Sequence, residues 1–343
     1  MQRKTFLTSC ATAFGGVLFP FNNAVHAIEK IDPPTYIIPP YLKAGDTVGI
    51  TSPAGFITKE QIEPAILQIQ SWGYKVNIGQ AIGRRDFTRG GTDEERAADF
   101  QQMIDDPDIK AIMCARGGYG SLGMVDKVDW RKFIKNPKWI IGFSDITILH
   151  SHIHRTCKVA SIHSKMCNSF PDDWNKAEPI QRETINSIRD SLAGIKMKYS
   201  ATPGIWNKQG EGRGVLTGGN LKTIETLSGT KSDIDTRGKI LFVEDTGEYL
   251  YSLDRMFWHL KRTGKLDALQ GLIVGGFNIK DDDAGDEFGR TLEEIVLNKV
   301  KEFNYPVCFN FPVGHQRANF AFKCGVRHRL SVNADAVTLQ ETA

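Results

Sequence analysis

The sequence has few cysteines, and none of them is closely spaced. Only six of the 343 residues are cysteine and no Cys-x-x-Cys pair occurs, so neither a zinc site nor a thioredoxin-type redox motif is indicated. One cysteine, Cys10, lies near the N-terminus. The other five are scattered: Cys114, Cys157, Cys167, Cys308 and Cys324. Their odd number and wide spacing do not predict a disulfide framework, and we expect most of them to be small buried residues. A single disulfide in an oxidising compartment stays open.

The sequence also lacks a strong net charge, a long apolar segment and internal repeats. The formal net charge is +3 and the isoelectric point is near 8.4, too mild to predict nucleic acid as the main partner. After the N-terminus no apolar run is long enough to cross a bilayer. With 41% hydrophobic and 24% charged residues, the composition is typical of a globular protein. The length suggests about two domains.

Residues 1–27 have the three-part pattern of a secretory signal peptide. A basic start (MQRK) precedes an apolar, small-residue stretch, and AVHA then offers small residues before Ile28. We expect export to the periplasm. Residues 3–7 faintly resemble a twin-arginine signal in which lysine replaces one arginine. A lipoprotein box at residues 7–10 is less supported, because almost no apolar segment precedes it. A disordered or helical extension is the alternative.

Strands and helices are predicted to alternate in the N-terminal part, residues 28–170. The expected strands are 44–55, 74–78, 109–114 and 138–142. The expected helices are 61–72, 92–104 and a segment ending at 155, and Thr92 with Glu95 forms a capping box. Such alternation predicts an α/β fold with a parallel sheet, in which ligands bind at the carboxyl ends of the strands.

The C-terminal part, residues 206–343, mixes strands and helices and has more hairpin character. A polar segment, residues 171–205, is interpreted as the connection between the two domains. Beyond it, strands are expected at 238–242 and 271–276 and a helix at 251–261, and the segment 329–340 is β-like at the end of the chain. Thr291 and Glu294 form a second capping box.

Ser144 lies on a predicted strand-to-helix corner in KWIIGFSDIT, residues 138–147. A sharp turn of this kind exposes a serine hydroxyl and directs the next backbone N–H, that of Asp145, towards a developing oxyanion. Because GFSD is not the GxSxG elbow, the local pattern alone favours a plain helix N-cap. A nucleophile and a cap would use the same turn.

The segment ARGGYGS, residues 115–121, follows another predicted strand. Glycine N–H groups can approach a ligand closely and bind an anion. The segment does not match GxGxxG, so an oxyanion or carboxylate site is favoured over a dinucleotide site. A tight turn with a solvated arginine is the alternative.

Glu244 and His315 are the other candidates for chemistry. Glu244 ends an apolar strand, where its carboxylate could orient a histidine; Asp245 and Glu248 could do the same. His315 follows a glycine on a loop and could act as a general base. In isolation, a solvated strand end and an ordinary loop histidine are the more frequent interpretations. The order Ser144, Glu244, His315 is one that serine triads use.

Two polar clusters lack the spacing of metal sites. His150, His152 and His154 have no HExxH pattern and no cysteine partner. The acidic run at 281–287 lacks the alternating ligands of an EF-hand. We expect structural or surface histidines, a solvated loop, and no metal or cofactor.

Together these segments resemble the LD-carboxypeptidase family, serine peptidases of the S66 type. The matching stretches follow the family's order and cover nearly all of the chain after residue 27: GDTVGITSPAG, GGTDEERAADF, ARGGYGS, GFSDIT, LTGGNLKTIETLSGT, ILFVEDTGE with YSLDRMFWHL, and VGH. The resemblance implies an N-terminal Rossmann-like parallel-sheet domain that carries the serine. It also implies a smaller, β-rich C-terminal domain that carries the glutamate and the histidine, with the active site in the cleft between the domains.

The resemblance also implies roles for individual residues. Ser144 becomes the nucleophile, Glu244 the orienting carboxylate and His315 the general base. The backbone N–H of Asp145, with that of Gly117 or Gly118, would form the oxyanion hole.

Two side chains are candidates for substrate binding. Arg116 could pair with the substrate's terminal carboxylate by its charge and fork geometry, and Tyr119 lies close to it in the sequence. The implied substrate is a murein tetrapeptide, cleaved at the amide between the L-centre of meso-diaminopimelate or lysine and the terminal D-alanine. A homodimer is common in the family.

Two features depart from the family pattern. Family members often have a His-Gly-Pro-like segment where this chain has IHSKMCN, residues 162–168, so the preferred substrate is in doubt. The signal peptide would place the enzyme against murein outside the cytoplasm, which could favour trimming of the sacculus or an endopeptidase activity. One rival function is microcin-immunity hydrolysis of acyl-adenylate analogues, with Trp206 as a shelf for the base. Another is non-catalytic binding of murein.

Overall fold

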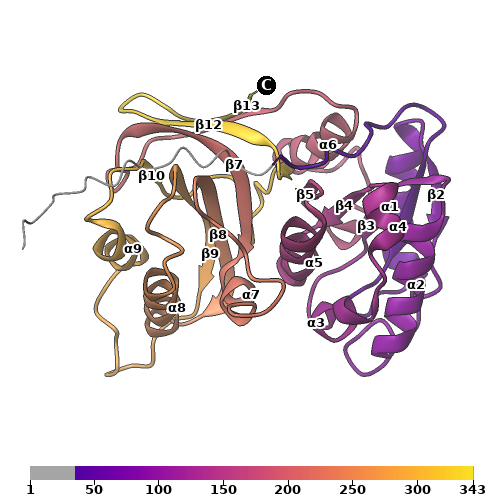
Figure 1. The fold of residues 1–343 in the computed structure, drawn as a ribbon, viewed down its shortest axis with the longest axis horizontal. Helices are drawn as coiled ribbons and strands as arrows, with labels where there is room; N and C mark the ends of the chain where they lie inside the picture. Colours follow the sequence, from indigo (N-terminus) through magenta and orange to yellow (C-terminus); the bar gives the residue numbers. More distant parts are fainter. Residues whose placement is uncertain (1–34, 343) are drawn as a thin grey trace, which may run out of the picture. The chain divides into compact units, whose positions relative to one another are not determined.

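The computed structural model describes residues 35–342, so the predicted signal peptide lies outside the described residues. Two β-sheets, each accompanied by helices, organise this part of the chain (Figure 1). The predicted α/β class with a parallel sheet and two domains is confirmed.

The first sheet has six strands in the order β11-β5-β4-β3-β1-β2. Its parallel strands are β1 (Thr47–Thr51), β2 (Lys75–Ile78), β3 (Ile109–Cys114), β4 (Trp139–Gly142) and β5 (Ser161–His163). The short strand β11 (Phe322–Cys324) comes from far along the chain and pairs antiparallel with β5. Every residue of β4 is buried, as expected for a central strand covered on both faces.

Helices follow the strands of this half. Thr58 caps α1 (Lys59–Ser71), and Thr92 caps α2 (Asp93–Asp105) in the predicted capping box with Glu95. The others are α3 (Ser121–Met124), η1 (Val125–Lys127), α4 (Arg131–Lys135), η2 (Ser144–Ile146), α5 (Thr147–His152), η3 (Ile153–Cys157), η4 (Cys167–Ser169) and α6 (Pro179–Leu192). The last of these, α6, falls within the predicted connection, and its apolar face joins the core packed on the first sheet.

The second sheet has seven strands in the order β10-β9-β8-β7-β12-β13-β6. Its parallel strands are β7 (Gly210–Asn220), β8 (Lys239–Glu248), β9 (Gly271–Ile279) and β10 (Val307–Cys308). Its antiparallel strands are β12 (Arg327–Val332), β13 (Val337–Glu341) and β6 (Lys198–Ala201). The helices of this half are α7 (Leu221–Thr226), α8 (Leu250–Arg262) and α9 (Leu292–Val300). Thr291 and Glu294 form the predicted capping box at the start of α9.

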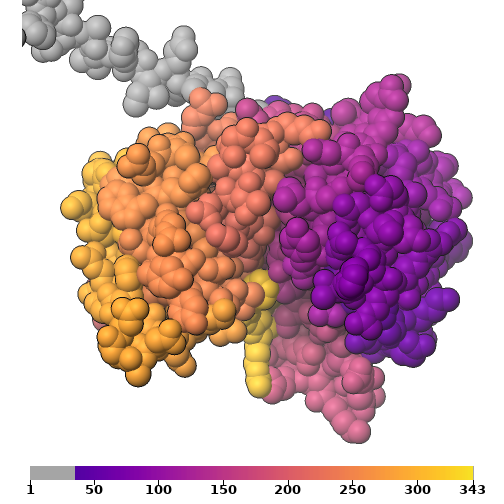
Figure 2. Space-filling model, turned by 90° about the horizontal axis from the view of Figure 1, so that it is seen from below, coloured from indigo at the N-terminus to yellow at the C-terminus, as the bar shows by residue number. Residues whose placement is uncertain are grey.

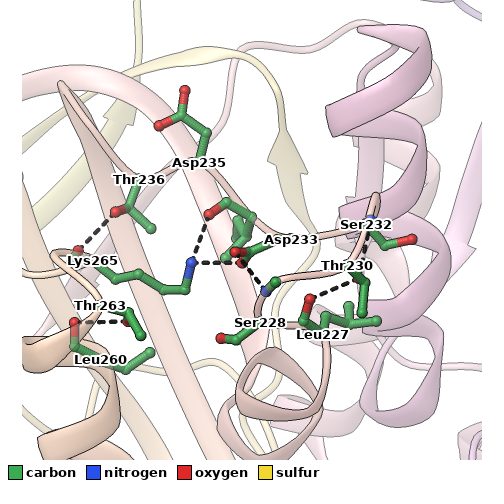
Figure 3. A network of polar contacts seen from close by, with 12 residues as sticks. Leu227, Ser228, Thr230, Ser232, Asp233, Asp235, Thr236, Leu260, Thr263 and Lys265 are labelled. Atoms are coloured by element: carbon green, nitrogen blue, oxygen red, sulfur yellow. Dashed lines mark hydrogen bonds and ion pairs between the residues drawn. The ribbon is translucent and has the colours of Figure 1, made fainter.

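The two halves of the described chain are in contact, and Figure 2 shows the first half, indigo to magenta, meeting the second half, orange to yellow. Among the hydrogen bonds that cross between them, two involve the ends of α5. The backbone N–H of Asn220 donates to Thr147 Oγ1 at 3.0 Å, and His152 Nδ1 lies 2.8 Å from Ser232 Oγ. The loop that carries Ser232 is stabilised by Lys265, whose ammonium donates to Asp233 (Figure 3). Both contacts therefore anchor α5 of the first half on ordered segments of the second.

The structure agrees with the expectation of small buried cysteines. The five cysteines between residues 35 and 342 are all buried, and none of them forms a disulfide. Within the same residues, no helix combines the length and the hydropathy needed to cross a membrane.

Candidate active site

Ser144 lies on a strained corner directly after β4. Its φ angle is +62°, a left-handed conformation that few non-glycine residues adopt and that is often found at functional sites. The N-cap position of η2 belongs to Phe143, and no side chain caps this turn. The corner serine therefore does not act as the plain helix cap that its sequence also allowed.

The turn after β3 lies against this corner. A Cβ atom added to Gly117 would come within 3.0 Å of Ser144 Cβ, so only glycine fits here without a shift. Gly118 has a φ angle of +97° and lines a cleft together with Ser144. The backbone of the ARGGYGS turn thus lies close to Ser144. This closeness is required if N–H groups of both turns are to bind the same anion.

Asp145 connects the two turns through its side chain, a role that its sequence position did not indicate. Its Oδ2 accepts a hydrogen bond of 2.8 Å from the backbone N–H of Ser121. Burial raises the pKa of Asp145, partly opposed by that hydrogen bond. The carboxylate therefore positions the end of one turn against the start of the other.

Arg96 is a second positioning residue that the sequence analysis missed. It is fully buried on α2, and its guanidinium donates to the carbonyls of Pro53, Gly91 and Gly120. These carbonyls belong to loops at the carboxyl ends of neighbouring strands. A buried arginine with several backbone acceptors stabilises such loops. From the sequence alone, an arginine within a predicted helix is expected to lie on the surface.

Glu244 and His315 are in direct contact. His315 Nδ1 lies 2.5 Å from Glu244 Oε2, and the same oxygen accepts the backbone N–H of His315 at 3.2 Å. Glu244 is fully buried on β8, and His315 is 19% exposed. Gly314 permits this approach, because its φ angle is +100° and an added Cβ would lie 2.3 Å from Glu244 Cβ.

The surroundings of His315 favour its protonated form. Burial by itself lowers the pKa of the imidazole, but the hydrogen bond and the charge of Glu244 outweigh burial, and the net pKa is raised. Because a carboxylate only accepts hydrogen bonds, it selects the tautomer with the proton on Nδ1. Nε2 then carries the lone pair that a general base needs.

Phe143 links His315 to the serine corner. The ring centroids of Phe143 and His315 are 5.0 Å apart, and Phe143 directly precedes Ser144. The structure therefore places the contacting pair of Glu244 and His315, from the second half of the chain, against the residue that precedes Ser144. Within residues 35–342 no hydrogen bond joins the serine hydroxyl to His315; such bonds are often long in free enzymes and tighten with substrate.

A cleft of about 310 Å³ opens beside Ser144. Its walls come from both halves: Gly118, Tyr119, Leu122, Ser144, Asp145, Ile148, Asn220, Lys222, Thr223, Thr226, Asp245, Thr246 and Glu248. Asn220 Nδ2 donates to Asp245 Oδ1 at 2.9 Å, and burial raises the pKa of Asp245 to about 6. The GGNL motif could have indicated Asn220 as a site residue. Its hydrogen bond with Asp245 could not be predicted from the sequence, because the two residues come together only in the folded chain.

The two predicted substrate-binding side chains differ in position. Tyr119 lines the cleft and is 65% exposed. Arg116 is not among the lining residues, and its guanidinium donates to the carbonyl of Phe56 at 3.0 Å. Arg116 thus binds backbone here, and its role towards a substrate stays a prediction.

The histidines of the 150–154 cluster are buried and bound to protein atoms. His150 contacts the carbonyl of Gly142, His152 contacts Ser232, and His154 contacts Ser161. Burial lowers the pKa of His150 and His152 to about 4. In the part of the chain that the structure describes, no group of three His, Cys, Asp or Glu residues is arranged to hold a metal ion.

Comparisons with known proteins identify the family of the chain. Residues 48–164 match the model of the LD-carboxypeptidase N-terminal domain, and residues 213–330 match that of the C-terminal domain. The chain is 31% identical over 295 residues to a probable murein peptide carboxypeptidase of Bacillus subtilis, covering 84% of this chain and 90% of that protein. It is 30% identical to a murein tetrapeptide carboxypeptidase of Pseudomonas aeruginosa, covering 81% and 91%.

A solved structure has the same fold. The microcin C7 self-immunity protein MccF, in complex with aspartyl sulfamoyl adenosine, superposes with a TM-score of 0.77 at 25% identity, covering 90% of this chain and 99% of that one. Two domain models that match in order, together with relatives aligned over most of both lengths, decide the assignment. The chain belongs to the LD-carboxypeptidase family of serine peptidases, the S66 family.

Proposed function

We propose that the protein is a serine hydrolase that removes the terminal D-alanine from murein tetrapeptides through Ser144, His315 and Glu244. The observation that carries the proposal is the contact between His315 Nδ1 and Glu244 Oε2 beside a serine with a φ angle of +62°. This contact leaves His315 Nε2 free to accept a proton.

In the proposed first step, His315 Nε2 takes the proton of the Ser144 hydroxyl as its oxygen attacks the carbonyl carbon of the scissile amide. The carbonyl oxygen becomes an oxyanion that accepts hydrogen bonds from the N–H of Asp145 and of Gly117 or Gly118. The carbon–nitrogen bond then breaks, and His315 gives its proton to the leaving amine of D-alanine. An acyl group remains on Ser144.

In the second step, water hydrolyses the acyl group. His315 again takes a proton, now from the water, and returns it to the Ser144 oxygen when the peptide leaves. Glu244 orients the imidazole and stabilises its charged form in both steps, without becoming protonated itself.

The murein substrate is supported by the names of the relatives in B. subtilis and P. aeruginosa. The microcin-immunity alternative has weaker support. A nucleobase shelf at Trp206 would have to face the serine, but Trp206 is 41% exposed and does not line the cleft with Ser144. A purely murein-binding protein would have no use for the contact between His315 and Glu244.

The decisive experiment follows D-alanine release from a disaccharide tetrapeptide by mass spectrometry. The wild-type protein should release D-alanine, and Ser144→Ala should reduce the rate by about 10³-fold or more. Lack of release by the wild-type protein, or equal release by the variant, would refute the proposal. A crosslinked dimeric muropeptide in a parallel assay separates carboxypeptidase from endopeptidase activity.

We also propose that the protein is exported to the periplasm. The support is the pattern of residues 1–27, with the small residues of AVHA before Ile28. Expression of the full chain, cell fractionation and mass measurement of the product should give a periplasmic protein that begins at Ile28. A cytoplasmic product of full length would contradict export.

A further inference from the structure

A second cleft, of about 490 Å³, is lined by the segment after β5, the start of α6 and Arg317. Lys165, Pro171, Asp173, Glu178 and Arg317 are among the residues that line it. Lys165 belongs to the segment IHSKMCN that departs from the family pattern. Nothing in the proposed mechanism uses this cleft, so its function must be inferred from its own side chains.

Two residues of the lining, Lys165 and Arg317, belong to segments that contact or carry the proposed catalytic residues. On one side, the N–H of Ser164 donates to the carbonyl of Gly142 at 3.1 Å. Met166 Cε lies 3.3 Å from the place of a Cβ on Gly117. On the other side, Arg317 follows His315 by two residues. Lys165 lies between Ser164 and Met166 in the chain, so the cleft adjoins the segments that contact Gly142 and Gly117 and that carry His315.

The Lys165 side chain is largely buried, and its ammonium faces the cleft without a protein partner among the described residues. The residue is 8% exposed, yet its ammonium makes no hydrogen bond and no ion pair with any residue between 35 and 342. The acidic residues of the cleft do not pair with Lys165. Asp173 pairs with Lys176 at 3.3 Å, and Glu178 pairs with Arg317 at 2.7 Å. Asp172, also in the lining, forms no ion pair with Lys165 within 4 Å.

The other buried lysines provide an internal comparison. Each has an acceptor: Lys138 binds backbone carbonyls, Lys239 binds Tyr36 and a carbonyl, Lys265 binds Asp233 (Figure 3), Lys299 binds Asp254, and Lys323 binds Glu341. A buried charge is costly unless it is paired. Burial lowers the pKa of Lys165, and an anion entering the cleft would oppose that effect.

We propose that the Lys165 ammonium binds a carboxylate group of the peptide substrate in this cleft. The inference rests on the proposed function, because the murein tetrapeptide is the source of the carboxylate. That peptide offers three: on the terminal D-alanine, on the side chain of meso-diaminopimelate and on D-isoglutamate. An ammonium within a partly buried cleft binds a carboxylate more strongly than an exposed one does, because less water competes.

The first test compares kinetics of wild type and Lys165→Met on the disaccharide tetrapeptide. We expect KM to rise about 10- to 100-fold, the range of a charge-assisted hydrogen bond, with kcat changed less than about threefold. Lys165→Arg should recover most of the loss, because it retains the charge. Lys135→Met, which removes an equal charge from the exposed surface of α4, is the matched control and should behave as wild type.

Three analogues then identify the carboxylate. One has D-alanine amide at the end, one has lysine in place of meso-diaminopimelate, and one has D-isoglutamine in place of D-isoglutamate. The effect of Lys165→Met should vanish on the analogue that lacks the bound carboxylate and persist on the other two. An equal effect on all three, or an effect below threefold on the parent peptide, overturns the proposal.

Two further measurements separate this inference from misfolding and from the proposed function. Lys165→Met should leave the melting temperature nearly unchanged, since no protein group within residues 35–342 pairs with the Lys165 ammonium, whereas Lys299→Met should lower it by leaving Asp254 unpaired. Calorimetric binding of the tetrapeptide to Ser144→Ala and to Ser144→Ala with Lys165→Met needs no catalysis. If the wild-type protein releases no D-alanine, the proposed function fails. Independently of that result, equal affinity of Ser144→Ala with and without Lys165→Met for the tetrapeptide would refute a role for Lys165.

Discussion

At the scale of single residues, the environment decides what a side chain can do. His315 in sequence is one loop histidine among eight histidines. Contact with the buried carboxylate of Glu244 selects its tautomer and raises the pKa of the imidazole against the effect of burial. Other histidines, such as His150, are buried without a carboxylate partner and have a lowered pKa.

Replacement of Glu244 by glutamine tests this assignment. The base must be neutral to act, so kcat/KM should fall as pH drops through the raised pKa of His315, above its ordinary value of about 6.5. In Glu244→Gln the charge that raises the pKa is gone, and the acidic limb should move to lower pH. The kcat value should drop by about 10³- to 10⁴-fold, because the imidazole loses its tautomer and orientation.

The measurement is the pH profile of D-alanine release between pH 5 and 9. Glu63→Gln is a suitable control, because it removes an equal charge from the exposed surface of α1 and Glu63 makes no hydrogen bond with His315. An unshifted acidic limb in Glu244→Gln would argue that another group titrates.

At the scale of secondary-structure elements, local sequence patterns predicted where several helices begin. The capping boxes at Thr92 and Thr291 are confirmed, because such caps depend only on residues three positions apart. Strand β11 was not predicted: its three residues have no periodicity of their own and are defined by pairing with β5. Helix α6 was read as part of a polar connection because only one of its faces is apolar.

The glycine pair that precedes Asn220 joins the two halves, and Gly219→Ala tests its importance. A Cβ at Gly219 would lie 2.4 Å from Thr147 Oγ1, and the φ angle of +146° disfavours any side chain. We expect a loss of about 2 kcal/mol or more in the free energy of unfolding and at least tenfold lower activity, since α5 follows directly after the Ser144 turn.

Urea unfolding and D-alanine release measure both effects. Gly229→Ala is the matched control, because Gly229 also has a positive φ of +77° but nothing lies within 4 Å of an added Cβ. Combining Gly219→Ala with Thr147→Ala should recover part of the stability if the steric contact is the cause. Equal losses at Gly219 and Gly229 would point to backbone strain alone.

At the scale of the whole molecule, buried histidines make stability depend on pH. Burial lowers the pKa of His150, His152 and His328 to about 4. The unfolded chain, with a histidine pKa near 6.5, then binds more protons than the folded chain between about pH 6.5 and 4. Stability should therefore fall as the solution is acidified through this range.

We expect the free energy of unfolding to be lower at pH 5 than at pH 7.5 by on the order of 1 kcal/mol for each such histidine. Three groups with raised pKa values, Asp145, Asp245 and His315, oppose the trend. They are outnumbered by the buried histidines with lowered pKa values, which also include His154 and His163. Urea unfolding at the two pH values measures the change. His152→Asn, which retains an acceptor for Ser232, should reduce the dependence; equal stability at both pH values would contradict the burial of neutral histidines.

The sequence by itself determined the α/β class, most of the strands and helices, and the family. These depend on local periodicity and on motifs that follow one another along the chain in a recognisable order. Ser144, Glu244 and His315 were identified by such motifs, although 171 residues separate the first from the last. Only the tertiary structure decided that Glu244 contacts His315, that the Asp145 carboxylate connects two turns, and that the Lys165 ammonium faces a cleft without a protein partner in the described part of the chain. The physical reason is that burial, and the pairing of charges within it, depend on segments that come together only when the chain folds.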